Sequence, residues 1–208
     1  MDGARECTQC GAEFSPRREH ARFCSARCRA QWNRARSADP AAEISALEWS
    51  IAAMSDTTAR LQDAAVADPG QAHTLISDAV WRVTIVDATL VRHHPEAYDQ
   101  VVADQSPCER EQTETTLAGL RHVRNRIGAG VNHDELVEPA DAAITSWTWK
   151  DLPRPCARDG EAQAWELARY DAYRAGLAGH KIGETFGPVV EFLSRAAGSA
   201  SLLITNSQ

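Results

Sequence analysis

Two close pairs of cysteines near the N-terminus constrain the fold of this chain more than any other feature. Two residues separate Cys7 from Cys10, three separate Cys24 from Cys28, and thirteen lie between the pairs. Zinc prefers four ligands in tetrahedral geometry, and two such pairs brought together supply four thiolates. We therefore expect one structural zinc ion per chain, with these four cysteines as its ligands.

Other arrangements of the cysteines remain open at this point. The pairs could form disulfides, which a reducing compartment disfavours, or a redox motif, which needs a larger surrounding fold than residues 1–36 can provide. His20 could replace one of the cysteines as a ligand. Four sulfur ligands leave no open coordination position, so the metal is predicted to be structural and to be required for folding of residues 5–30.

Residues 1–36, called the head below, resemble the FCS-like, treble-clef-type zinc fingers. In those fingers a CxxCGxxF segment is followed by an arginine-rich loop and then by FCSxxCRxxxxR. The matching residues here are Cys7, Cys10, Gly11, Phe14, Phe23, Cys24, Ser25, Cys28, Arg29 and Arg34. The resemblance implies that a helix begins near the second cysteine pair.

Charge is distributed unevenly along the chain. The formal net charge is −7, yet the head contains eight arginines against four acids, which leaves about −11 on the remainder. Arginines bind the phosphates of a nucleic acid, and an aromatic side chain placed among them can stack on its bases. The head is therefore predicted to bind RNA or DNA through Arg17, Arg18, Arg27, Arg29, Trp32 and Arg34. The alternative is a solvated face, or one that docks on the acidic body of the same or a neighbouring chain.

Residues 37–208 show the three- and four-residue apolar spacing of helices. Asp68-Pro69 and Ser106-Pro107 each combine a capping side chain with a proline at the first helical position, which marks a helix start. Helices are expected over residues 44–61, 69–92, 95–104, 106–127 and 159–197, the last as two helices. A short extended piece is expected at 144–149, within a connection over 134–158.

The fold class that follows is mainly α. We expect a four-cysteine zinc finger at 1–36 and an all-α bundle of four or five helices at 37–208. Hydrophobic residues make up 43% of the chain and charged residues 25%, as in ordinary soluble proteins. No run approaches 18 uninterrupted apolar residues, and the N-terminus lacks the apolar core of a signal peptide. We therefore expect a cytoplasmic protein with no membrane partner.

The stretch at residues 121–133 reads RHVRNRIGAGVNH. It resembles the signature of the HEPN superfamily of helical bundles, many of which are RNases. In that signature four to six residues separate an arginine, often followed by a polar residue such as asparagine, from a histidine. Arg124-Asn125 carries the dipeptide, and eight residues separate Arg124 from His133. Six residues separate Arg126 from His133, with Ile127 in the polar position.

The resemblance implies metal-independent RNA cleavage at the interface of a homodimer, as in toxin or defence proteins. His133 would exchange a proton with the ribose 2′-hydroxyl or the leaving oxygen, for which a pKa near that of free histidine is suited. Arg126 or Arg124 would hold the scissile phosphate, and Asn125 would orient one of these groups.

A structural interpretation of the same stretch is also open. Arginines near a helix C-terminus complement its dipole, and glycines end helices. The body could then be an inactive HEPN-like bundle or an unrelated one. The rival function is a non-enzymatic DNA- or RNA-binding regulator whose bundle serves for dimerisation.

Overall fold

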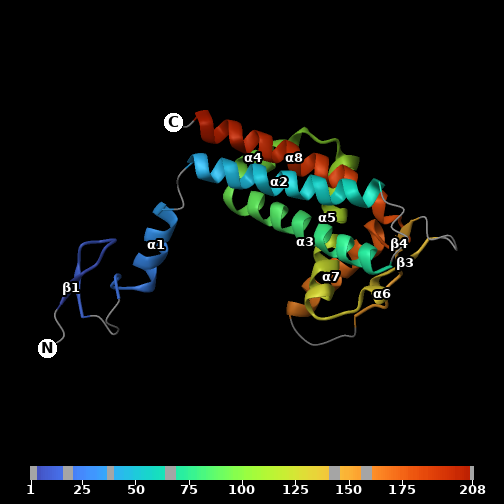
Figure 1. The fold of residues 1–208 in the computed structure, drawn as a ribbon, viewed down its shortest axis with the longest axis horizontal. Coiled ribbons are helices and arrows are strands. Elements are labelled where there is room, and N and C mark those ends of the chain that lie inside the picture. The colour runs from blue at the N-terminus through green and yellow to red at the C-terminus, as the bar shows by residue number, and fades with distance from the viewer. Residues whose placement is uncertain are drawn as a thin grey trace. The chain divides into compact units, whose positions relative to one another are not determined.

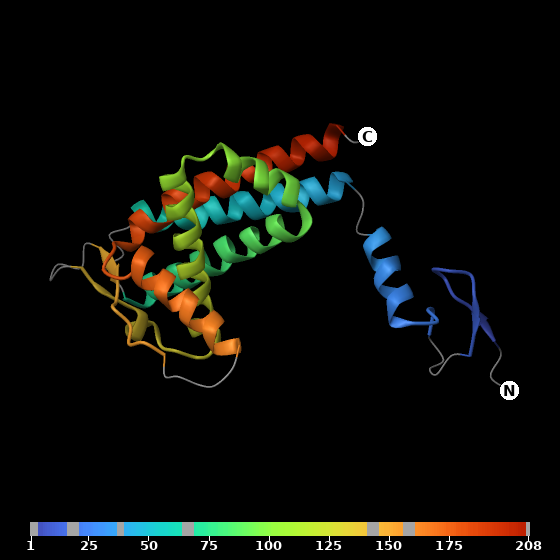
Figure 2. The same cartoon turned by 180° about the vertical axis from the view of Figure 1, so that it is seen from behind.

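The computed structural model describes residues 4–15, 21–36, 40–63, 69–140, 146–155 and 161–206. The chain divides into two compact units, Met1–Ala46 and Leu47–Gln208. Figures 1 and 2 show the N-terminal unit in blue and the helical unit from cyan to red. The division falls inside one helix, so the predicted domain limits at residues 36 and 37 stay a prediction.

The head is built from very short elements. Strands β1 (Arg5–Glu6) and β2 (Glu13–Phe14) pair antiparallel, with Glu6 opposite Glu13. Helix α1 (Ala26–Arg36) follows. The helix begins directly after Ser25, as the resemblance to FCS-like fingers led us to expect. Units of this size bury too little apolar surface to fold by hydrophobic packing alone.

The rest of the chain is mainly helical, as predicted. The long helices are α2 (Pro40–Asp63), α3 (Pro69–His93), α4 (Pro95–Asp104), α5 (Pro107–Gly128), α7 (Glu161–Gly176) and α8 (Ile182–Asn206). Their bounds lie within four residues of the expected ones, except that α8 runs to Asn206, nine residues beyond the expected end at residue 197. The described part of the bundle contains these six helices, as the expected ranges indicated, whereas a bundle of four or five was expected. The shortest of the six, α4, packs against α8 and belongs to the bundle.

The start of α5 follows the rule that its sequence suggested. The hydroxyl of Ser106 accepts a hydrogen bond from the backbone N–H of Glu109 (3.3 Å). The carboxylate of Glu109 in turn accepts from the N–H of Ser106 (2.9 Å). This reciprocal capping box satisfies two N–H groups that a helix start otherwise leaves unpaired. It fixes the first turn of the helix that carries the arginine motif.

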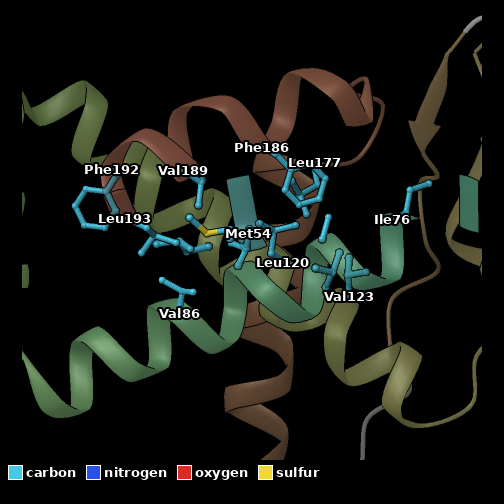
Figure 3. Packing of buried hydrophobic residues seen from close by; sticks show 14 of the residues in the cluster. Met54, Ile76, Val86, Leu120, Val123, Leu177, Phe186, Val189, Phe192 and Leu193 are labelled. Atoms are coloured by element: carbon cyan, nitrogen blue, oxygen red, sulfur yellow. The ribbon is translucent and has the colours of Figure 1, made fainter. Parts of the chain in front are cut away.

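The hydrophobic core joins α2, α3, α5, α7 and α8. Met54 of α2 lies among Val86 of α3, Leu120 of α5 and Leu193 of α8 (Figure 3). Side chains from helices far apart in the sequence thus share one core. None of the helices in the described ranges is both long and apolar enough to cross a membrane.

Two glycines let α5 and α7 approach closely. A Cβ atom built on Gly119 would lie 2.9 Å from Cδ1 of Leu177 and 3.2 Å from Cα of Tyr173. A Cβ on Gly176 would lie 2.9 Å from Cγ2 of Thr115. Cβ atoms rarely approach other heavy atoms this closely, so α5 and α7 can cross at this distance only because both residues are glycines.

The connection between α5 and α7 contains more structure than expected. Helix α6 (His133–Leu136) leads into β3 (Val137–Pro139), which pairs antiparallel with β4 (Trp147–Trp149). The expected extended piece is therefore present at β4, although residues 141–145 lie outside the described ranges. The fully buried indole of Trp149 donates to the hydroxyl of Thr185 (2.9 Å), which ties this connection to α8.

Candidate functional site

The four cysteines of the head form one cluster. Their Sγ atoms all lie within 4.8 Å of one another. The Sγ of Cys24 is 3.6 Å from that of Cys10 and 3.5 Å from that of Cys28. Sulfur atoms around a tetrahedral zinc ion at about 2.3 Å are about 3.8 Å apart. The distances between the sulfur atoms are therefore close to those around one tetrahedral metal ion, and the four thiols could hold such an ion.

A tight backbone turn places the first pair. The N–H of Gly11 donates to the carbonyl of Cys7 (2.9 Å), and the N–H of Cys7 donates to the carbonyl of Ala12 (2.9 Å). Gly11 has φ +71°, a left-handed conformation that glycine adopts at no steric cost. The N–H of Cys24 donates to Sγ of Cys7 (3.4 Å), which links the two pairs.

The second pair is placed by the first turn of α1. The hydroxyl of Ser25 accepts from the N–H of Cys28 (3.1 Å), as an N-terminal cap does. Cys24 precedes this cap and Cys28 lies inside the helix, so the turn brings both sulfurs to the same side. The serine that follows the cysteine in the FCS segment thus has a local structural role.

The electrostatics of the cluster favour a bound cation. Burial opposes ionisation of Cys7, but hydrogen bonds from the backbone N–H groups of Cys24, Gln9 and Cys10 lower the pKa of its thiol to about 6. The neighbouring sulfurs of Cys28, Cys10 and Cys7 raise the pKa of Cys24 to about 12. Four thiolates cannot share so small a volume without a positive ion between them. The described cysteines are all free thiols, and His20 and Cys156 lie outside the described residues.

The predicted nucleic-acid residues of the head are described in part. Arg27 and Arg29 are exposed on α1. Trp32 is half-buried, because its ring packs 5.4 Å from that of Phe23 and the guanidinium of Arg22 lies 4.9 Å from its centroid. The predicted contact residues Arg17 and Arg18, and the side chain of Arg34, lie outside what the structure describes. Trp32 therefore forms part of the small apolar centre of the head.

The arginines of the motif on α5 have different surroundings. Arg121 donates to the carboxylate of Asp87 from Nε (2.9 Å) and from Nη2. Asp87 is buried on α3, so its pair with Arg121 links α5 to α3 and stabilises the bundle. His122 is also buried, against the rings of Tyr170 and Tyr173, and burial followed by the charge of Arg126 lowers its pKa. Arg121 is thus held by an ion pair within the bundle, and His122 lies in its interior.

The predicted catalytic residues lie at the end of α5 and just beyond it. Arg124, Asn125 and Arg126 are half-exposed in its last turns, and Nη2 of Arg124 lies 3.4 Å from Oδ1 of Asn125. The Nε of Arg126 is buried without a hydrogen-bond partner among the described residues. His133 begins α6, and its side chain lies outside what the structure describes.

The glycines end the helix, as predicted. Helix α5 stops at Gly128, and Gly130 has φ +81°. The N–H of Val131 then donates back to the carbonyl of Arg126 (3.1 Å). The chain therefore turns back within three residues of the helix end, and His133 follows two residues later.

Comparison with protein-family models, curated proteins and solved structures found no match to this chain. The resemblances to FCS-like fingers and to HEPN proteins therefore stand on the residues quoted above.

Sequence analysis did not predict two tryptophan–arginine pairs of the bundle, although Arg124 itself is one of the predicted catalytic residues. The guanidinium carbon of Arg124 lies 5.9 Å from the ring centroid of Trp81, on α3. That of Arg169 lies 3.6 Å from the ring centroid of Trp165, on the same helix α7. The second pair is four residues apart, a spacing that puts both side chains on one helix face and could have revealed it from sequence. Arg124 and Trp81 lie on two different helices, so no short sequence spacing indicates their contact.

Proposed function

We propose that the head is a zinc-dependent nucleic-acid-binding module. The observation that carries this proposal is the four-thiol cluster at the base of α1, a helix with exposed Arg27 and Arg29. Zinc is the metal of choice, because it accepts four thiolates in tetrahedral geometry without an energetic preference for another arrangement. The ion would be held by Cys7, Cys10, Cys24 and Cys28.

The charge of α1 supports a polyanionic partner. Its sequence, ARCRAQWNRAR, contains four arginines and no acidic residue. Lysine and arginine contacts to phosphates supply most of the affinity of nucleic-acid binding and make it depend on salt. The metal cluster would hold the helix in place while its arginines contact RNA or DNA.

Replacing Arg27 and Arg29 together by alanine is expected to weaken nucleic-acid binding. The plot of log affinity against log salt should become shallower by about 1.5 to 2 units, since two phosphate contacts are lost. Fluorescence anisotropy with labelled RNA and DNA measures both quantities. Arg195→Ala, an exposed arginine on α8, is the matched control and should leave the slope unchanged. An unchanged slope in the double variant, with metal retained, would refute the proposal.

We also propose that the end of α5 cleaves RNA, as the resemblance to HEPN proteins implies. The supporting observation is the turn that follows α5, together with the buried Nε of Arg126 that has no partner in the described part of the chain. Arg126 or Arg124 would bind the scissile phosphate, with Asn125 as an orienting neighbour. His133 would transfer the proton, without a metal ion, and a homodimer would bring two such sites together.

His133→Ala should lower the rate of RNA cleavage by about a hundredfold, because it removes the proton-transfer group. Cleavage of a labelled RNA followed on gels, in a buffer without added metal ions or chelator, measures the rate. His93→Ala is the control, since His93 is an exposed histidine at the end of α3. Equal rates in wild type and His133→Ala would exclude this catalytic role. Binding without cleavage in wild type would favour the non-enzymatic regulator.

A further inference from the structure

The bundle carries an arginine–tryptophan surface of its own, formed by Trp81, Arg124, Arg169 and Trp165. Trp81 is 40% exposed and Trp165 is 52% exposed, although large aromatic side chains are normally buried. Each ring has a guanidinium within cation–π distance, at 5.9 Å for Trp81 and 3.6 Å for Trp165. These rings are therefore exposed beside positive charge.

The positive charge of this surface is poorly compensated. Burial lowers the pKa of Arg169, and the charges of Arg121 and Arg124 lower it further. The rings of His122 and Tyr170 are 5.9 Å apart, so the parts of α5 and α7 that carry these three arginines lie side by side. Of these, Arg121 is paired with Asp87. Within the described ranges, neither Arg124 nor Arg169 forms an ion pair. Glu166 lies one turn before Arg169 and is exposed. The surface is thus a local basic site on an acidic body.

The surface adjoins the arginine motif. A Cβ built on Gly128, the last residue of α5, would lie 4.0 Å from Cζ2 of Trp81. Trp81 therefore lies beside the last turn of α5, next to Arg124, where α3 and α5 pack against each other. Figures 1 and 2 show the two helices crossing. A polymer bound along these helices would pass the end of α5.

We propose that this surface binds single-stranded nucleic acid, with unpaired bases stacking on Trp81 and Trp165 and phosphates bound by Arg124 and Arg169. Stacking on exposed rings combined with a basic track is how proteins bind single strands without reading sequence. Paired bases already stack on each other in a duplex and present only their edges, so a duplex cannot use the rings. The inference concerns the bundle and does not depend on the metal head or on cleavage.

Binding of the full chain to labelled 12-nucleotide strands of uridine and of thymidine, and to a duplex, tests the proposal. Trp81→Leu and Trp165→Leu should each weaken single-strand binding at least about fivefold, because each removes one stacking contact. Trp81→Phe and Trp165→Phe, which keep a ring, should retain most of the affinity. Arg169→Gln should make the salt dependence shallower by about 0.7, the value for one phosphate of a single strand.

Two exposed residues away from this surface provide controls. Trp49→Leu changes a tryptophan that is 70% exposed on α2, and Arg174→Gln changes an arginine of α7 that already pairs with Asp151 (3.2 Å). Both should bind as wild type does. The tryptophan variants would overturn the proposal if they bound single strands normally, or if the loss were equal for the duplex. A changed oligomeric state in Trp81→Leu without weaker binding would assign the face to a second copy of this chain.

The same measurements separate this inference from the function proposed for the head. Arg27→Ala with Arg29→Ala should weaken single-strand and duplex binding alike, whereas the tryptophan variants act on single strands alone. If only the tryptophan variants lose affinity, the head proposal fails and the bundle surface stands. If only the head variant loses affinity, the reverse holds.

Discussion

Removal of the metal with a strong chelator should unfold the head and leave the helical bundle folded. In its described residues the head has two strands of two residues each, one helix and a centre formed by Phe23 and Trp32. So small a centre cannot offset the conformational entropy of the ordered residues. Structural zinc sites contribute about 10–16 kcal/mol to folding at neutral pH. Loss of the ion should therefore abolish the fold of this unit outright.

Metal analysis and two-dimensional NMR of the full chain measure this outcome. We expect about one zinc ion per chain before chelation, and collapse of the head resonances to random-coil positions afterwards. Cys24→Ser should have the same effect as the chelator. Cys108→Ser is the matched control, because Cys108 is an exposed thiol on α5 outside the cluster. Dispersed head resonances after metal removal, or equal metal loss in both variants, would contradict a structural role.

The four-cysteine cluster could be predicted from sequence because the determinants of each cysteine pair are local. Each cysteine pair spans one turn, and short-range geometry brings its two sulfurs together whatever the rest of the chain does. The same holds for the start of α5, where Ser106, Pro107 and Glu109 lie within four positions and form the cap that their spacing indicates. In such cases local preferences and the final fold agree.

The roles of the arginines on α5 could not be predicted in this way. Arg121 and Arg124 are three residues apart on one helix, yet one pairs with a buried carboxylate and the other lies over a tryptophan. Both partners, Asp87 and Trp81, lie on α3, more than thirty positions earlier. Strands β3 and β4 were predicted only in part, because a strand of three residues is too short to show a clear alternation of apolar and polar residues. Their position also depends on the contact of Trp149 with α8, which is distant in the sequence.

Replacing Asp87 by alanine should destabilise the bundle by about 3 kcal/mol, because it leaves Arg121 without its buried partner. The side chain of Asp87 is only 1% exposed, and it also accepts from the hydroxyl of Tyr98 (3.1 Å), so one carboxylate joins α3, α4 and α5. The side chain of Arg121 is 31% exposed and keeps some contact with water, which places the expected loss at the lower end for buried pairs. For a unit of this size the loss corresponds to a fall in melting temperature of about 6 to 12 °C.

Thermal and urea unfolding followed by tryptophan fluorescence measure this loss. Asp151→Ala is the matched control, because Asp151 pairs with Arg174 at the surface (3.2 Å), where both side chains are more than half exposed. Such a pair contributes at most about 1 kcal/mol. Arg121→Met in the Asp87→Leu background should recover part of the stability, since an apolar pair leaves no unpaired charge. If Asp87→Ala lowered the free energy of unfolding no more than Asp151→Ala does, the pair of Arg121 with Asp87 would not stabilise the bundle. Arg121 would then be grouped with Arg124 and Arg169 in the basic surface.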